Sequence, residues 1–352
     1  MASQFKHLGV RMIKAALPLA LASLMTAGFS QADVPSVAVD ITPVHSLVMQ
    51  VMGELGEPKL VISAGASPHA YSLRPSEARA LQDADIVFWV SAGLTPWLSE
   101  TIVTLAPDAT RVELLEVDGV TELAMRENAL FEAHEHDDHA DEEHEGEEHE
   151  GEGHDEHEGE EHEGEEHHDD ESEHDEHDEH DHGEHDPHAW LDPSNAAIWL
   201  DAIADELSKA DPANTETYQA NAASGKAELE QLKSDIQETL APVRGRSFIV
   251  FHDAYQYFEN AFDFAASGAI SVSDASKPSP ARIQEIRDRV SQANVTCVLT
   301  EPQFNPDLVS TVLDGTDART TEIDSLGSHL DVGPTFYNQL LRELAKNLAG
   351  CV

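Results

Sequence analysis

The sequence predicts an α/β protein with two lobes, each built on a mostly parallel sheet flanked by helices, and one long rigid helix that joins them. Three observations lead to this prediction. Short apolar segments with strand composition alternate with segments whose apolar residues recur at helical spacing. One helical pattern continues for about 28 residues before Pro242. Without residues 1–32 and an acidic stretch at 132–186, about 265 residues remain, which suits two lobes of ordinary domain size.

The first 32 residues have the composition of a secretory signal peptide. Three cations, Lys6, Arg11 and Lys14, precede an apolar run at 15–27 that is too short to span a bilayer. A cleavage site of the small-x-small type ends at Ala32. We therefore expect an exported protein, although a buried N-terminal helix is the alternative. No later segment has the length and apolarity of a membrane span.

The first lobe is predicted over residues 33–210. Short strands are expected at 37–39 and 59–62, with a helix at 42–53 between them, and a buried apolar strand follows at 85–90. Parallel strands need a crossover connection, usually a helix, so this alternation indicates a parallel sheet.

A linking helix is predicted over 211–242 and the second lobe over 243–352. Asp211-Pro212 is a helix start because proline suits the first helical turn. The helix would be roughly 40 Å long at 1.5 Å per residue, which is enough to reach both lobes. In the second lobe we expect strands at 247–251 and 297–300 and helices at 280–293 and 335–348.

The stretch at 132–186 combines histidine with acid. It contains 15 His and 31 Asp or Glu, without Lys, Arg or aromatic residues. Such a segment cannot bury a core, so we expect a disordered loop. Acidic runs are usually solvated tethers. Because imidazole and carboxylate also ligate divalent transition metals, the density of histidine favours a metal-collecting loop.

Cys297 and Cys351 are an even pair in a protein expected to be exported. Disulfides persist in oxidising compartments, so we expect the two residues to be bonded. The bond would tie the end of the chain to a strand 54 positions earlier. Two buried thiols are the alternative. A Cys-based metal site is disfavoured because close CxxC spacing is absent.

Four candidate metal ligands lie in loops, mostly after predicted strands. Ligands of open α/β sheets bind beyond the carboxyl ends of the strands, so side chains from such loops can meet in one cleft. A single His at a strand end is usually an ordinary polar residue, so the prediction rests on the four together. Two come from each lobe, and they are His69, His188, His252 and Asp324.

The motifs around these residues resemble a known family. They are GASPHAYSLRPSEA, HAWLDP, FHDAYQYFE, CVLTEPQFNP and IDSLG. With the His-rich insertion before HAWLDP and the terminal Cys, they resemble the metal-binding solute-binding proteins of ABC-type importers. The resemblance is strongest to the zinc-specific periplasmic ZnuA type, and it extends from Val37 to Cys351.

The resemblance implies two α/β lobes joined by one long helix, with a metal ion in the cleft. It implies His69, His188 and His252 as ligands. Some members add a carboxylate from the residue before the first His. That position is Pro68 here, which leaves Asp324 or water as the fourth ligand.

The implied cargo is Zn²⁺, because three neutral imidazoles and one oxygen suit tetrahedral zinc, whereas manganese favours oxygen ligands. The implied partner is an ABC-type membrane permease, and the protein is expected to be a monomer and not an enzyme. The stretch at 132–186 contributes −31 of the net charge of −49, and the remaining −18 still argues against nucleic acid as a partner and suits a protein that handles cations. His45 and His329 are expected not to be ligands.

Two other functions are compatible with parts of the sequence. Three His and a water also form catalytic zinc sites, so a zinc-dependent hydrolase is one alternative. The HExxH and GxSxG motifs that many hydrolases carry are absent from the sequence. A zinc storage protein acting through 132–186 is the other alternative, but storage would not require two lobes.

Overall fold

The computed structural model describes most of the chain after the expected signal peptide. That peptide and nearly all of the His-rich stretch lie outside the described residues, which are 34–126, 130–131, 185–271, 279–292, 295–303 and 306–352. Within these ranges, none of the helices combines the length and the apolarity that crossing a membrane would require.

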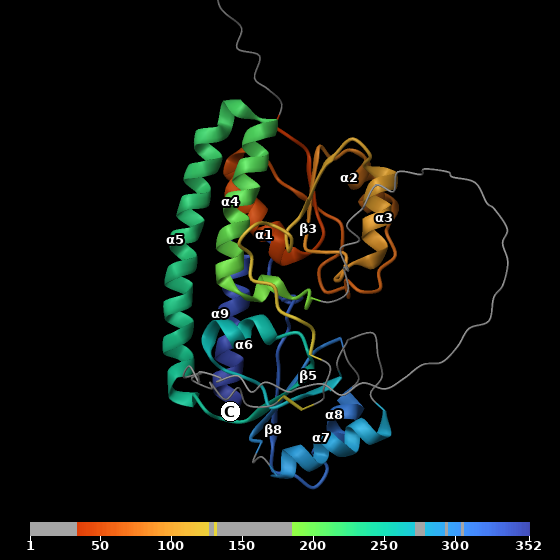
Figure 1. The fold of residues 1–352 in the computed structure, drawn as a ribbon, viewed down its shortest axis with the longest axis vertical. Helices are drawn as coiled ribbons and strands as arrows, with labels where there is room; N and C mark the ends of the chain where they lie inside the picture. Colours follow the sequence, from red (N-terminus) through yellow and green to blue (C-terminus); the bar gives the residue numbers. More distant parts are fainter. Residues whose placement is uncertain (1–33, 127–129, 132–184, 272–278, 293–294, 304–305) are drawn as a thin grey trace, which may run out of the picture. The chain divides into compact units, whose positions relative to one another are not determined.

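The first sheet is built from four parallel strands. Its elements are β1 (Val37–Val39), α1 (Thr42–Met52), β2 (Lys59–Leu60), α2 (Pro75–Gln82), β3 (Ile86–Trp89), α3 (Pro96–Leu105) and β4 (Thr110–Glu113). The strand order is β2-β1-β3-β4. Strands β1 and β3 are buried throughout, which is why they form continuous apolar runs in the sequence. Helix α1 lies on one side of the sheet, and α2 and α3 lie on the other (Figure 1).

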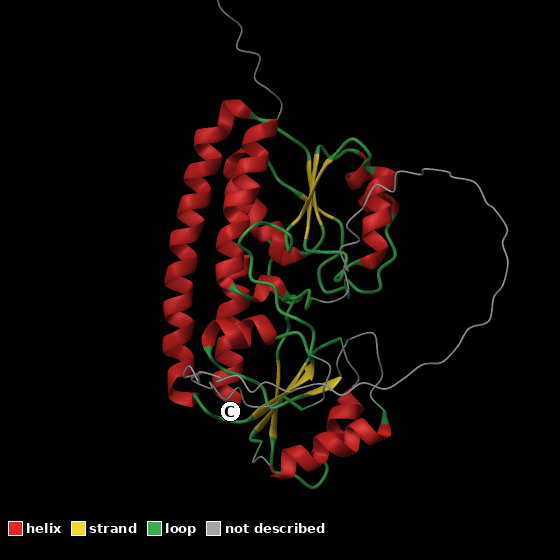
Figure 2. Cartoon of the chain, in the orientation of Figure 1, coloured by secondary structure: helices red, strands yellow, loops and turns green. Residues whose placement is uncertain are grey.

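The second sheet has the strand order β6-β5-β7-β8 and is again parallel. Figure 2 shows the strands of the two sheets in yellow among the helices. Its elements are β5 (Phe248–His252), α6 (Gln256–Phe262), β6 (Ala269–Ser271), α7 (Pro280–Gln292), β7 (Cys297–Thr300), α8 (Pro306–Leu313), β8 (Arg319–Glu322) and α9 (Phe336–Cys351). The two parallel sheets with flanking helices confirm the predicted α/β class. Several predicted bounds differ slightly from the structure, and one of these differences concerns a candidate ligand: His252 is the last residue of β5 and does not follow the strand.

Two long helices, α4 (Pro193–Ala210) and α5 (Thr215–Leu240), pack side by side (Figure 1). Helix α5 lies within the range predicted for the linking helix. At 1.5 Å per residue it is about 39 Å long. It contacts α1 and α4 beside the first sheet, and α6 and α9 beside the second sheet. One helix therefore supports elements of both sheets.

Gly225 permits the close packing of α5 on its neighbours. A Cβ atom at this position would lie 2.9 Å from Leu200 Cδ1 of α4 and 3.0 Å from Gln50 Oε1 of α1. Helix α4 is not among the elements predicted from the sequence, although it has a clear start. Asp192 caps it by accepting a hydrogen bond from Ser194 N at 2.7 Å, and Pro193 occupies its first turn.

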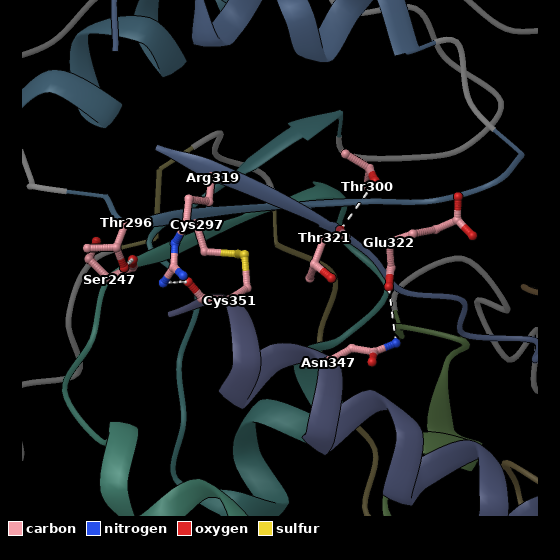
Figure 3. Close-up of a disulfide and its surroundings, with 9 residues drawn as sticks. All are labelled: Ser247, Thr296, Cys297, Thr300, Arg319, Thr321, Glu322, Asn347 and Cys351. Atoms are coloured by element: carbon pink, nitrogen blue, oxygen red, sulfur yellow. Dashed lines mark hydrogen bonds between the residues drawn. A yellow bond between two sulfur atoms is a disulfide. The ribbon is translucent and has the colours of Figure 1, made fainter. Parts of the chain in front are cut away.

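A disulfide between Cys297 and Cys351 fastens the end of α9 to β7 (Figure 3). Both residues are buried, and their Cα atoms are 5.6 Å apart. Two hydrogen bonds join the same helix to β8, because Arg319 donates to the carbonyl of Cys351 and Asn347 donates to the carbonyl of Glu322. The last helix is thereby held on the second sheet at several points.

We expect reduction of this disulfide to lower the melting temperature of the metal-free protein. A cross-link across 54 residues restricts the unfolded chain by roughly 4 kcal/mol in the chain-entropy treatment. Thermal unfolding with and without reductant measures the effect. The Cys297→Ala/Cys351→Ala variant is the control and should not respond to reductant. Two titratable thiols in denatured, unreduced protein would refute the bond.

Candidate metal centre

Three of the four candidate ligands line one small hollow of about 20 Å³. His69 lies in the loop between β2 and α2, His188 immediately precedes the 3₁₀ turn η2 (Ala189–Leu191), and His252 ends β5. His188 and His252 are each 5% exposed, whereas His69 is half-buried. The hollow is thus lined by one side chain from a loop of the first sheet, one from the residue before η2, and one from the end of a strand of the second sheet.

The three imidazoles surround the hollow closely. The His188 ring centroid lies 5.9 Å from that of His69 and 5.3 Å from that of His252. The Nε2 atoms of His188 and His252 are 3.5 Å apart. With Zn–N bonds of about 2.0–2.1 Å, two nitrogens of a tetrahedral site lie about 3.4 Å apart, so this pair already has nearly the required spacing.

The described part of the chain holds no group of three His, Cys, Asp or Glu side chains already placed to share an ion. The Nε2 atoms of His188 and His252 nevertheless approach each other closely. His69 is the most exposed of the three and comes from a loop, whereas the other two are buried.

A buried carboxylate holds each of the two buried imidazoles. Asp186 Oδ1 lies 2.7 Å from His188 Nδ1, and Glu301 Oε1 lies 2.7 Å from His252 Nδ1. A carboxylate at Nδ1 keeps the ring proton on that nitrogen, which leaves the lone pair of Nε2 for a metal. The Nε2 atoms are the ones that approach each other at the hollow. This arrangement is typical of imidazoles that bind a metal.

Asp186 and Glu301 are not among the site residues predicted from the sequence. A signal for Glu301 exists, since it follows the predicted strand at 297–300, which pairs with the strand that ends in His252. Neighbouring parallel strands bring their carboxyl ends together. Asp186 stands two residues before His188, but it is also the last of the 31 acids of the His-rich stretch and is not distinguished by composition.

The backbone around the imidazoles is held by aromatic side chains. Trp190 packs beside His188 with ring centroids 5.3 Å apart, and its Nε1 donates to the carbonyl of Ser325 at 2.9 Å. The hydroxyl of Tyr337, on α9, donates to the carbonyl of Trp190 at 2.7 Å. Trp97 Nε1, on α3, donates to the carbonyl of Pro68 at 2.8 Å, next to His69. The ligand-bearing turns are thus tied to helices of both sheets.

Asp324, the fourth candidate, is engaged within its own loop. Its Oδ1 accepts hydrogen bonds from Leu326 N at 2.9 Å and Gln303 Nε2 at 3.2 Å, and its Oδ2 accepts one from Ser328 N at 2.7 Å. It lines a different hollow, beside His329. The structure therefore places the three histidines around one hollow, and Asp324 is not among the residues that line it, although its neighbours Ser325 and Leu326 are.

The two histidines that are predicted not to be ligands lie away from the hollow. His45 is buried in α1, with Nε2 3.0 Å from the carbonyl of Pro58, and burial lowers its pKa. His329 is largely exposed and pairs with Glu343 at 2.9 Å. Neither residue lines the hollow with the three imidazoles.

The structure is thus a two-sheet α/β protein in which three imidazoles line one small hollow. A family model described as "ZnuA: Zinc-uptake complex component A periplasmic" matches residues 37–351. The high-affinity zinc uptake system proteins ZnuA of Brucella abortus and Paracoccus denitrificans are 45% and 43% identical to the chain. These alignments cover 95% and 97% of the chain and 98% and 99% of the relatives. The chain belongs to the ZnuA family, as its motifs predict.

Solved structures share the fold. A crystal structure of ZnuA aligns with a TM-score of 0.67 at 22% identity, covering 91% of this chain and 99% of that one. The Pseudomonas aeruginosa solute-binding protein FpvC, in complex with Mn²⁺, aligns with a TM-score of 0.66 at 19% identity, covering 90% and 98%. Similarity at this level of identity establishes the common architecture.

We expect Asp186→Asn and Glu301→Gln each to weaken zinc binding by about 10- to 100-fold, because carboxylates that orient ligating imidazoles typically have effects of this size. Competition titration against a chelator measures the change. Glu343→Gln is a matched control, since it removes a carboxylate that contacts His329 in the same way away from the hollow. Wild-type affinity in both site variants would show that these carboxylates do not support the ligands.

Proposed function

We propose that this protein captures Zn²⁺ in the periplasm with high affinity and delivers it to an ABC-type membrane permease for import. Family membership supports this role, and the relatives from Brucella abortus and Paracoccus denitrificans are named for high-affinity zinc uptake. The observation that carries the proposal is the His188–His252 pair. Two imidazoles from separate elements present Nε2 atoms 3.5 Å apart, each oriented by its own carboxylate.

The proposed ligands are His69, His188 and His252, with water as the fourth. Three neutral imidazoles and one oxygen suit tetrahedral zinc, whereas manganese favours more oxygen ligands. Water is proposed as the fourth ligand because Asp324 does not line the hollow and its carboxylate already accepts hydrogen bonds from Leu326 N and Ser328 N. Binding would draw the loop of His69 toward the two buried imidazoles.

The remaining parts of the chain have separate roles in this proposal. The segment at 1–32 directs export and is removed, and the His-rich stretch at 132–186 collects zinc. The lobes at 33–210 and 243–352 close on the ion, with the helix at 211–242 as their common support.

A hydrolase is supported less well than a transport protein. A catalytic zinc site needs a base near the metal-bound water. The two carboxylates beside the hollow, Asp186 and Glu301, are both hydrogen-bonded to imidazoles, so the arrangement favours holding an ion over activating water. Zinc-dependent turnover of generic esters by the purified protein would favour the enzyme instead.

We expect His69→Ala, His188→Ala and His252→Ala each to weaken the tightest zinc site by more than about tenfold, because each removes one of three nitrogen ligands. Asp324→Ala should weaken it less. Chelator competition gives the affinities, and His329→Ala is the control that should bind as the wild type does. A His variant with wild-type affinity would exclude that residue from the site.

Replacing residues 132–184 with a short Gly/Ser linker should preserve one tight zinc site and abolish weaker ones. The composition of residues 132–184 predicts a disordered loop, and ligands on such a loop must order backbone at about 1–2 kcal/mol per residue when they bind, whereas the proposed ligands at the hollow are ordered by folding. The weaker sites of the intact protein should also disappear below about pH 6, as the histidines protonate. Isothermal titration at two pH values measures both effects. Loss of the tight site would mean that the replaced residues supply one of its ligands.

A further inference from the structure

A segment between β4 and the His-rich stretch connects the two sheets beside the metal centre. We name it the strap, and its described residues are 120–126 and 130–131. Its first part contacts the segment that carries His188, since the carbonyl of Leu123 accepts a hydrogen bond from Asp186 N at 2.7 Å. Its last part reaches the second sheet, where Phe131 N donates to the carbonyl of Ser267 at 3.3 Å.

Arg126, in the strap, bonds to two acids of the second sheet's elements: Asp253, which follows β5, and Glu259 on α6. Its Nε donates to Asp253 Oδ2 at 2.9 Å, and a second nitrogen contacts the other oxygen of the same carboxylate. Its Nη1 donates to Glu259 Oε2 at 2.8 Å, and the guanidinium lies 3.6 Å from the centre of the Phe131 ring. A single guanidinium thus donates to two carboxylates and contacts one of them in a bidentate manner, which among the side chains only arginine can do.

The two carboxylates depend on this guanidinium. The side chains of Asp253 and Glu259 are each 5% exposed, and that of Arg126 is 18% exposed. Burial raises the pKa of both carboxyl groups, and Arg126 opposes this by favouring their charged forms. Removing the arginine would leave two buried acids without their cation, which is strongly unfavourable.

We propose that Arg126 is a positioning residue for the metal centre: by holding Asp253 on the strap, it keeps His252 aligned with His188. Asp253 is the neighbour of His252 in the chain. Three residues before Arg126, Leu123 holds Asp186, the carboxylate that orients His188. One strap therefore supports both imidazoles. The inference rests on the proposed function, because it takes the three histidines as the zinc ligands.

A positioning role differs measurably from a purely structural one. If Arg126 only stabilised the fold, its loss would lower the melting temperatures of the metal-free and zinc-loaded proteins equally and leave zinc affinity unchanged. If it aligns the imidazoles, zinc affinity should fall, zinc should dissociate faster, and the visible absorption of bound Co²⁺ should change with the ligand geometry.

The test compares Arg126→Gln and Arg126→Lys with Arg289→Gln. Arg289 donates to the carbonyl of Phe131 at 3.1 Å, so its loss loosens the same strap without touching Asp253. We expect Arg126→Gln to weaken zinc binding about tenfold or more, with faster release and an altered Co²⁺ spectrum. Arg126→Lys should recover part of the affinity, and Arg289→Gln should match the wild type. Affinity within twofold of the wild type in Arg126→Gln would overturn the proposal.

Two further variants keep the result interpretable. If Arg126→Gln does not fold, Arg126→Gln/Asp253→Asn/Glu259→Gln removes all three charges while keeping the shape of the cluster. Weak zinc binding by this neutral variant supports a positioning role for Arg126, and zinc binding as in the wild type overturns it.

His188→Ala is titrated in parallel. If it binds as tightly as the wild type, the proposed centre is wrong. If it loses affinity while Arg126→Gln does not, only the inference about Arg126 fails.

Discussion

The contact on which the site depends is the hydrogen bond between a buried carboxylate and the Nδ1 atom of a buried imidazole. It occurs twice, at Asp186–His188 and at Glu301–His252, each time at 2.7 Å. A buried neutral imidazole must place its proton on one nitrogen, and the carboxylate decides which. Both Nε2 lone pairs then face the same hollow. Without this constraint, the spacing of 3.5 Å between the two nitrogens would have no chemical consequence.

The rest of the fold keeps these two pairs in place. Glu301 meets His252 because β7 lies beside β5 in a parallel sheet, so both strands end at the same edge. The turn that carries His188 is fixed from the other side, through Trp190 and the hydroxyl of Tyr337 on α9. Helix α9 is in turn joined to β7 by the disulfide. Because folding itself orders His188 and His252, binding of an ion at the proposed centre would cost these two side chains little further conformational freedom.

The sequence predicted the architecture well because burial leaves periodic patterns. The strands at 37–39 and 297–300 have the predicted bounds, and α5 lies within the predicted range. The partners of the ligands were harder to predict because they depend on which strands are neighbours. The order β6-β5-β7-β8 is a property of tertiary packing, and no local pattern encodes it. The hydrogen bonds of Asp324 to its own loop likewise depend on the conformation of that turn.

The protein is acidic, yet imidazole nitrogens and not free carboxylates line the proposed metal centre, because the carboxylates around the hollow are hydrogen-bonded. Four carboxylates near it are buried, and each is engaged by a donor: Asp186 by His188, Glu301 by His252, Asp253 by Arg126, and Asp324 by backbone amides. In the proposed centre, these hydrogen bonds would compete with coordination of an ion by oxygen, the ligand type that suits magnesium or manganese. The imidazole nitrogens would remain, and they suit zinc. Preference for zinc in the proposed centre would then arise as much from the hydrogen bonds that occupy the acids as from the imidazoles themselves.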